Sequence, residues 1–285
     1  MKRFSLIVFW VLTATVFSFA QTTGYFPQIA DGVQSGGITW RTTIYVTNPA
    51  PSGASPAAVT ITFTASTGAP FQISFVDSAG APAGTGSLSF TITGGQTQKF
   101  VSTGAGALSI GFGTLNATAT VVGNAVFSEF GPGGLISEAS VSASGTSTSQ
   151  AIFVDTQSGF DTGVAYANPN GGPVSVGLEL LNTQGVRVVP STQQTLAGNQ
   201  QTAAFVKGAL FPSAPALAGS MRITSSAPVA VVALRFSAGG QFTTLPPVNL
   251  GDLLAPIAHW LEQRPWMNPL TSLARLLGGL QFRIG

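Results

Sequence analysis

Short runs of apolar residues alternate with polar residues along most of this chain, and turn residues separate the runs. This alternation is typical of half-buried β-strands, because successive side chains of a strand point to opposite faces. Helices would instead repeat their apolar positions with a period of about 3.6 residues. The first set of predicted strands lies at residues 44–46, 59–63, 71–76, 88–92, 100–101, 108–112 and 118–127. A second set lies at 152–154, 164–166, 174–181, 186–189, 202–206, 220–224 and 229–236. The sequence therefore predicts an all-β protein, and the short strands of each set favour a β-sandwich.

The two sets of strands carry matching motifs in the same order, which indicates an internal repeat. The motif TTIYVTNP at residues 42–49 returns as TGVAYANP at 162–169. Further matches pair residues 75–80 with 180–185, 94–101 with 198–206, and 130–134 with 236–240. We expect two tandem sandwich domains, at residues 21–143 and 151–250. The Ser/Thr-rich stretch 144–150 has a composition that resists packing, so we expect a semi-flexible linker there.

Several matching positions are suited to turns. Asp77 and Asn182 each stand three residues before a Gly, and Asp or Asn side chains bond the backbone of such a turn while Gly accepts positive φ. Asn48 and Asn168 are each followed by Pro, which cannot donate to a strand ladder. We expect these residues to shape the backbone.

The first twenty residues have the features of a secretory signal peptide. Lys2 and Arg3 provide a positive start, an apolar run extends from Leu6 to Phe19, and Ser18 and Ala20 are small residues suited to cleavage after Ala20. The apolar run is shorter than the roughly 20 residues that a membrane-spanning helix needs. We therefore expect a secreted or extracytoplasmic protein, located in the periplasm, on the cell surface or in the medium.

The composition agrees with an extracellular β protein. The 285 residues include 35 Gly and 18 Pro, and only 7% are charged. Residues 21–250 hold six Lys and Arg against seven Asp and Glu, so the repeat region is nearly neutral. It has no basic stripe for phosphate contacts, which argues against a nucleic-acid partner. The chain has no Cys, so its domains depend on their apolar cores and not on disulfides.

Candidate catalytic residues are restricted to carboxylates, because residues 21–250 contain neither His nor Cys. A pair among Asp31, Asp77, Asp155 and Asp161 would be needed for a glycoside hydrolase, which remains a remote alternative. Each of these residues lies beside Gly, Ser or Thr in a predicted turn, where capping the backbone is the commoner role. Asp155 and Asp161 are also weak candidates for oxygen ligands of Ca²⁺, although their spacing is not that of an EF-hand. We otherwise expect no cofactor and no enzymatic activity.

Aromatic residues offer a second kind of candidate site. The chain has 20 Phe and only three Tyr, a ratio that favours core packing over a sugar-binding surface. Trp40 and Tyr45 are weak candidates for ligand stacking, while burial of Trp40 on a central strand is the competing interpretation. Glu129 and Arg235 occupy nearly matching positions with opposite charge, so a contact between the domains through them is one hypothesis and a solvated edge is the other.

The segment 251–285 differs in character from the repeats. It contains His259, the only His of the chain, and two of the four Trp. Asn268 and Pro269 suit a helix start, and Leu270, Leu273, Leu276 and Leu277 would form an apolar stripe. A short amphipathic helix or a disordered tail is expected. Three roles remain open for it: packing on the second domain, association with a membrane surface or a partner, and no selected role.

The repeats resemble a family of uncharacterised secreted β-sandwich repeats found in environmental Gram-negative bacteria. The resemblance covers residues 21–248 and rests on the opening FPQIADG at residues 26–32 and on TTIYVTNP, while the second unit departs from it with IFVDTQSG at 152–159. The resemblance implies immunoglobulin-like sandwiches and an extracytoplasmic role, and it carries no catalytic residues.

The favoured function is a non-catalytic structural or adhesive module of the cell envelope or extracellular space. A carbohydrate-binding module is the alternative from another class. Expected partners are a cell-surface polysaccharide or an envelope protein, and membrane contact is expected only through residues 251–285.

Overall fold

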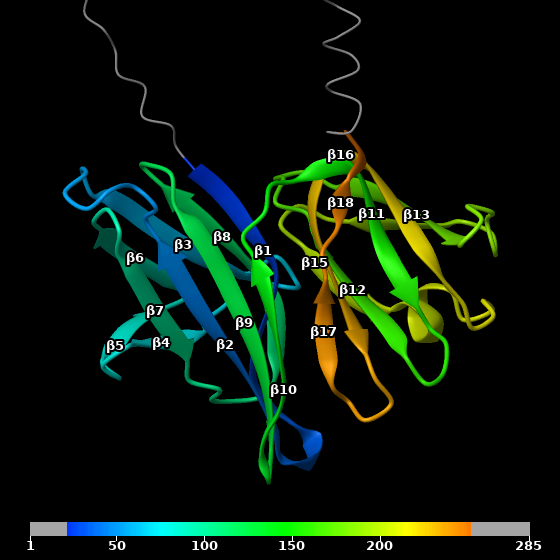
Figure 1. Ribbon diagram of the computed structural model, residues 1–285, viewed down its shortest axis with the longest axis horizontal. Helices are drawn as coiled ribbons and strands as arrows, with labels where there is room; N and C mark the ends of the chain where they lie inside the picture. Colours follow the sequence, from blue (N-terminus) through cyan, green and yellow to red (C-terminus); the bar gives the residue numbers. More distant parts are fainter. Residues whose placement is uncertain (1–21, 252–285) are drawn as a thin grey trace, which may run out of the picture.

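The computed structural model describes residues 22–251 and contains two β-sandwiches in tandem, so the all-β prediction is confirmed. Figure 1 shows the two sandwiches side by side, with β1 and β10 of the first facing β12 and β17 of the second. The expected signal peptide at residues 1–20 and the expected helix beyond residue 251 lie outside the described residues. Within residues 22–251, no helix is both long and apolar enough to cross a membrane.

The first domain contains ten strands in two layers. One layer has the order β1-β8-β3-β6 and the other has the order β5-β4-β7-β2-β9-β10. The strands are β1 (Thr22–Gln34), β2 (Ile38–Thr47), β3 (Ala57–Ala65), β4 (Ser74–Asp77), β5 (Pro82–Thr85), β6 (Ser87–Ile92), β7 (Thr97–Ser102), β8 (Ser109–Ala117), β9 (Val122–Gly131) and β10 (Gly134–Ser142). A short helical turn, η1 (Ser35–Gly37), connects β1 to β2.

Strand β1 belongs to both layers of the first domain. Its residues 22–31 pair with β8, and its last residues, from Gly32 to Gln34, pair with β2 in the other layer. The β1–β8 register shifts between Phe26 and Ile29, so Pro27 lies at a bulge, where a residue without an N–H is tolerated. The eight strands from β1 to β8 have the connectivity of a double-sheet jelly roll. In an immunoglobulin domain, by contrast, the first two strands share a sheet.

The second domain repeats this plan with fewer strands. Its layers have the orders β14-β13-β16-β11-β18 and β15-β12-β16-β17. The strands are β11 (Ser147–Asp155), β12 (Asp161–Ala167), β13 (Val174–Asn182), β14 (Thr192–Leu196), β15 (Gln201–Phe205), β16 (Ala218–Phe236), β17 (Phe242–Leu245) and β18 (Val248–Asn249), with one helical turn, η2 (Val206–Leu210). Strand β16 runs through both layers, and Pro228 lies where it passes from one layer to the other.

The strand pairing confirms the repeat and fixes which positions correspond. β2 pairs with β7 and β9, and β12 pairs with β15 and the second half of β16. The asparagines at the ends of β2 and β12 are both buried, and each accepts a hydrogen bond from the backbone N–H two residues later at 3.0 Å. Each also donates its side-chain N–H at the end of a neighbouring strand, Asn48 to the Ile92 carbonyl and Asn168 to the carbonyls of Leu196 and Ala197. The expected turn role of Asn48 and Asn168 is therefore confirmed.

The stretch 144–150 is not a free linker. Ser144 exchanges two backbone hydrogen bonds with Tyr25 of β1, and Ser147 already begins β11. In the second domain, Val248 pairs with Ala151 at the position that Ser144 holds opposite Tyr25 in the first. The composition of this segment predicts a hinge, but most of its residues pair with strands. Ser and Thr allow this because they also hydrate an edge strand well.

The apolar core of the first domain continues into the second. Ala165 of β12, Val232 of β16 and Phe242 of β17 are at most 5% exposed and belong to the same cluster as the core of the first domain. Leu234 and Phe236 pack against this cluster from the same sheet. The outer face of the β15-β12-β16-β17 layer thus completes the core of the first domain, so that core is shared across the interface. The second domain also has a separate apolar core of its own, which includes Ile152, Tyr166 and Leu178.

Candidate functional site

The interface between the domains combines the shared core with a border of polar contacts. The Ser137 hydroxyl of β10 accepts a hydrogen bond from the Phe242 N–H at 2.9 Å and donates to the Phe242 carbonyl at 3.3 Å. Thr244 Oγ1 donates to the Ser140 carbonyl at 2.6 Å. On the far side of the core, the Gln201 side-chain amide donates a hydrogen bond to the side-chain oxygen of Gln28. These contacts link both ends of the interface and fix one orientation of the domains.

Trp40 lies in this interface. Its indole stacks on the Phe242 ring, with centroids 5.5 Å apart and planes inclined by 22°, and its Nε1 donates to Gln34 Oε1 at 3.2 Å. The side chain is half-buried. Of the two interpretations of Trp40, the structure therefore places it mainly in packing, although between two domains and not inside one.

Tyr45 lies on the other face of β2. An odd number of positions separates it from Trp40, so the two side chains point to opposite faces of the strand and do not form one aromatic platform. Tyr45 is half-buried, and the Lys99 ammonium lies 5.9 Å from its ring centre. The structure thus leaves Tyr45 as a surface aromatic beside one cation.

A cavity of about 200 Å³ lies between the domains, and we call it the interdomain cavity. Domain 1 lines it with Gln28 and Ala30 of β1, Trp40 of β2 and Phe127 of β9, among others. Domain 2 lines it with residues of β12, β15 and β16, which are Gly163 to Ala165, Ala203 to Phe205, Val232, Leu234 and Phe236. No lining side chain is ionisable, so the cavity suits an uncharged and largely apolar occupant.

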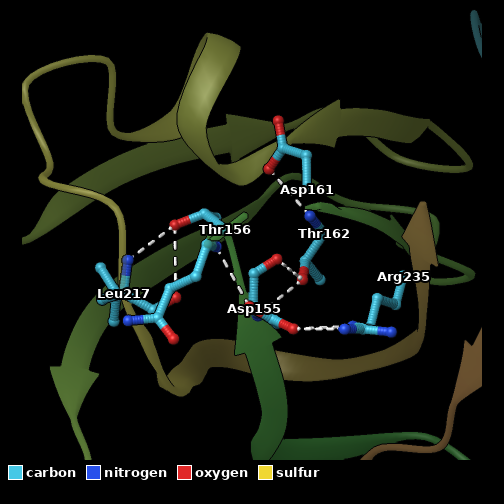
Figure 2. Close-up of polar contacts among 7 residues, drawn as sticks. Asp155, Thr156, Asp161, Thr162, Leu217 and Arg235 are labelled. Atoms are coloured by element: carbon cyan, nitrogen blue, oxygen red, sulfur yellow. Dashed lines mark hydrogen bonds and ion pairs between the residues drawn. The ribbon is translucent and has the colours of Figure 1, made fainter. Parts of the chain in front are cut away.

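Asp155 is engaged by an arginine of its own domain (Figure 2). Asp155 Oδ2 accepts hydrogen bonds from Arg235 Nε at 2.8 Å and from Arg235 Nη2 at 2.7 Å, and Asp155 Oδ1 accepts from the Gln157 N–H at 3.1 Å. The Arg235 guanidinium also lies 3.4 Å from the centre of the Phe160 ring. Both carboxylate oxygens of Asp155 thus have protein partners.

Asp161 caps the backbone beside this pair. Its Oδ1 accepts from the Thr162 N–H at 2.8 Å and from the Lys207 N–H at 3.4 Å. Thr162 in turn holds the backbone of Asp155 through its hydroxyl, as Figure 2 shows. Among residues 22–251, no three His, Cys, Asp or Glu side chains are grouped so that they could hold a metal ion. Asp155 and Asp161 therefore act here on an arginine and on backbone N–H groups.

The two acidic candidates of the first domain also have structural contacts. Asp31 is 6% exposed and accepts a hydrogen bond from the Gly104 N–H at 2.9 Å. Burial raises the pKa of Asp31 above its ordinary value, against the opposing effect of its hydrogen bonds to Ser102 and Gly104. Asp77 accepts from the N–H groups of Ala79 and Ala81, both at 2.9 Å, which confirms its predicted turn role.

The proposed contact between Glu129 and Arg235 does not form among residues 22–251. The Arg235 guanidinium is bound to Asp155, and Glu129 lies opposite Trp40 in the β2–β9 ladder, where burial raises the pKa of its carboxyl group. Thr42 and Thr162 are matching positions of the repeat. Phe127 lies opposite Thr42 in the first domain, and Arg235 lies opposite Thr162 in the second. Arg235 therefore corresponds to Phe127 and not to Glu129, because the β9–β10 hairpin is longer than its counterpart.

Comparisons with known proteins identify no family. No family model and no curated protein matches the chain. Among solved structures, the naturally occurring empty particles of Cowpea mosaic virus (top component) match at 8% identity and a TM-score of 0.22, over 81% of this chain and 89% of that one. A β-glucuronidase of glycoside hydrolase family 2 matches at 7% identity and a TM-score of 0.14, over 80% of this chain and 24% of that one. At these values neither structure informs the function of this chain.

Proposed function

We propose that the protein is a non-catalytic structural or adhesive module that works outside the cytoplasm. The observation that carries this proposal is the core shared by the two domains, which joins them into one stiff unit. A stiff pair of sandwiches holds its outer faces at a fixed separation, which suits a protein that spans a distance or presents a surface. The signal peptide expected from the sequence of residues 1–20 supports the compartment.

The use of the acidic residues supports a role without catalysis. Asp31 and Asp77 bond loop N–H groups, Asp155 pairs with Arg235, and Asp161 caps the start of β12. A glycosidase needs one carboxylate free to protonate the leaving group and a second free to attack or to activate water. Each of these four carboxylates has at least one structural contact of this kind, which favours a role in holding the fold.

The carbohydrate-binding alternative depends on Tyr45. Its ring lies on the outer face of β2, partly open to solvent, where a sugar could stack on it. Trp40 is less suited to that role because Phe242 covers one face of its indole.

Retention of the full-length chain on insoluble partners tests these proposals. The purified protein is incubated with isolated cell envelopes and with insoluble polysaccharides, in calcium and in chelator, and the Tyr45→Ala variant is carried in parallel. Retention on envelopes that Tyr45→Ala leaves unchanged is expected for an adhesive module. Retention on one polysaccharide that Tyr45→Ala removes would replace the adhesive role with carbohydrate binding, and loss of retention in chelator would overturn the expectation that no metal takes part.

A further inference from the structure

We infer that the interdomain cavity is a binding site for a small, neutral aromatic molecule that carries one hydrogen-bond acceptor. The inference does not rest on the structural or adhesive role. It follows from how the cavity arises in the repeat, from what lines it, and from where it opens.

The cavity exists because the second domain has small residues where the first has larger ones. Gly163 and Ala165 of β12 correspond to Thr43 and Tyr45 of β2, and Ala203 of β15 corresponds to Lys99 of β7. A Cβ at Gly163 would lie 3.1 Å from the Phe236 ring, and larger apolar residues at Ala165 and Ala203 would fill the space between the domains. Protein interiors are otherwise close-packed, and an empty apolar void of this size is destabilising. The small residues therefore maintain a space that packing alone would remove.

The lining selects for an aromatic and uncharged occupant. Four aromatic side chains face the cavity: Trp40, Phe127, Phe205 and Phe236. Phe205 and Phe236 already meet edge to face, with centroids 5.0 Å apart, and a bound ring would extend this cluster. A cavity of about 150 Å³ is known to take up benzene, so about 200 Å³ accommodates one ring with a small substituent. A charged ligand would lose its hydration and find no opposite charge.

The cavity is accessible from solvent, and polar groups lie in its lining. Ala203 and Gln34 are exposed, and Phe205 retains 44% of its accessible surface. The side-chain oxygen of Gln28 accepts a hydrogen bond from the Gln201 side chain, and the side-chain oxygen of Gln34 accepts one from the Trp40 indole. Within the described residues, the side-chain N–H₂ groups of Gln28 and Gln34 have no hydrogen-bond acceptor. They can donate to a carbonyl or hydroxyl oxygen of the ligand, which orients the ring toward the apolar wall.

Acetophenone is a suitable probe because it has one ring, one carbonyl acceptor and no charge. Its binding to the full-length chain is measured by calorimetry and by saturation-transfer NMR, beside cyclohexyl methyl ketone and benzoate. We expect saturable binding of acetophenone at one site and about tenfold or weaker affinity for the other two, which lack the ring's π-system or carry a charge. Absence of saturable acetophenone binding would overturn the inference. Equal affinity for benzoate or for the cyclohexyl ketone would overturn the ligand class.

Two variants locate the site, and a third serves as a control. Ala203→Leu fills the cavity from its exposed side, and Phe205→Ala removes one aromatic wall. Each is expected to weaken acetophenone binding about tenfold or more, because the larger leucine side chain at position 203 occupies the ligand's space and the alanine side chain at position 205 no longer contacts one face of the ring. The control Ala58→Leu makes the same change at an exposed strand position on β3, away from the lining, and should leave affinity unchanged. If Ala203→Leu lowers the melting temperature so far that binding cannot be measured, the affinity of Phe205→Ala for acetophenone still tests the location of the site. Unchanged affinity in a folded Phe205→Ala protein would place the ligand elsewhere.

Discussion

Trp40 of the first domain and Phe242 of the second stack with their ring centroids 5.5 Å apart, so the two domains meet through an aromatic pair. Phe242 also stands 5.2 Å from the Phe236 ring, and its backbone bonds to Ser137 on both its N–H and its carbonyl. Phe242 thus joins the aromatic packing of the interface to its polar border.

Replacing Phe242 with Ala should destabilise the whole protein and not only β17. Its side chain is 5% exposed in a core that both domains share, and burial losses of this kind typically cost about 3–5 kcal/mol. Urea unfolding followed by fluorescence and circular dichroism should give one transition in the native chain and a lower midpoint in the variant. Phe153→Ala is the control, because Phe153 is 50% exposed. Equal midpoints for the two variants would contradict the shared core.

Asn168→Ala should cost about 1–3 kcal/mol, since the buried Asn168 amide donates to the carbonyls of Gly172 and Ala197 at 2.9 Å and to the buried Leu196 carbonyl at 3.3 Å, and these acceptors would lose their partner. Asn168→Asp should be no better, because a carboxylate has no N–H to offer these oxygens. Equilibrium denaturation measures the effect. Asn124→Ala is a matched control, because the Asn124 amide bonds only a surface hydroxyl, that of Ser140. A similar loss in both variants would argue against a special role for the buried asparagine.

Asp31 should make the protein less stable as the pH rises. Burial raises the pKa of its carboxyl in the folded state above the ordinary value of 3.8, so folding favours the protonated form. Its contribution to stability is fully present below pH 3.8 and is lost as the pH rises through the raised pKa of the folded state. Asp31→Asn removes this dependence. The difference in unfolding free energy between variant and native protein should therefore shift in favour of the variant as the pH rises. A difference that stays constant across this range would show that the buried carboxyl does not titrate with folding.

Arg235→Ala should lower stability by about 1–3 kcal/mol, because Asp155 would keep its charge in a partly buried place without its partner. Calcium should not raise the melting temperature of the native protein, since Arg235 and the Gln157 N–H occupy the oxygens of Asp155. Thermal unfolding in calcium and in chelator tests both statements. A calcium-dependent rise in the native protein would restore Asp155 and Asp161 as metal ligands.

The repeat and its turns could be predicted from sequence because their causes are local. Asp77 and Asn182 bond the backbone within four residues of themselves, and any chain with the same residues at this spacing would favour the same turn. The apolar runs likewise placed most strands. Residues 186–189 were an exception, since Arg187 forms only one isolated bridge, to Leu181.

The strands that the pattern missed are those with weak apolar alternation. β10 and β14 are edge strands rich in Ser, Thr and Gln, and β1 is interrupted by Gly and by the bulge at Pro27. Their pairing depends on partners distant in sequence, which composition does not reveal. The pattern predicts two strands where the structure has the single strand β16, because Pro228 interrupts the apolar run. At Pro228 the strand continues from one layer of the second domain into the other.

The interface also had a signal that sequence reasoning did not use. Positions that face solvent in β2 carry Thr43 and Tyr45, whereas the matching positions of β12 carry Gly163 and Ala165. Loss of polar and bulky residues from one copy of a repeat indicates that this face has become covered. Comparing the two copies position by position could therefore have predicted which sheet packs against the other domain, though not the cavity, which depends on side-chain placement.

The shared core also constrains the order in which the chain acquires its structure. The first domain leaves the ribosome first, and domains commonly fold in that order. Here its apolar core is incomplete until residues 232–242 have been synthesised, because Val232 and Phe242 are part of it. The first domain therefore stays uncovered on this side for roughly ninety residues after β10 ends, which gives factors that shield nascent chains a surface to act on.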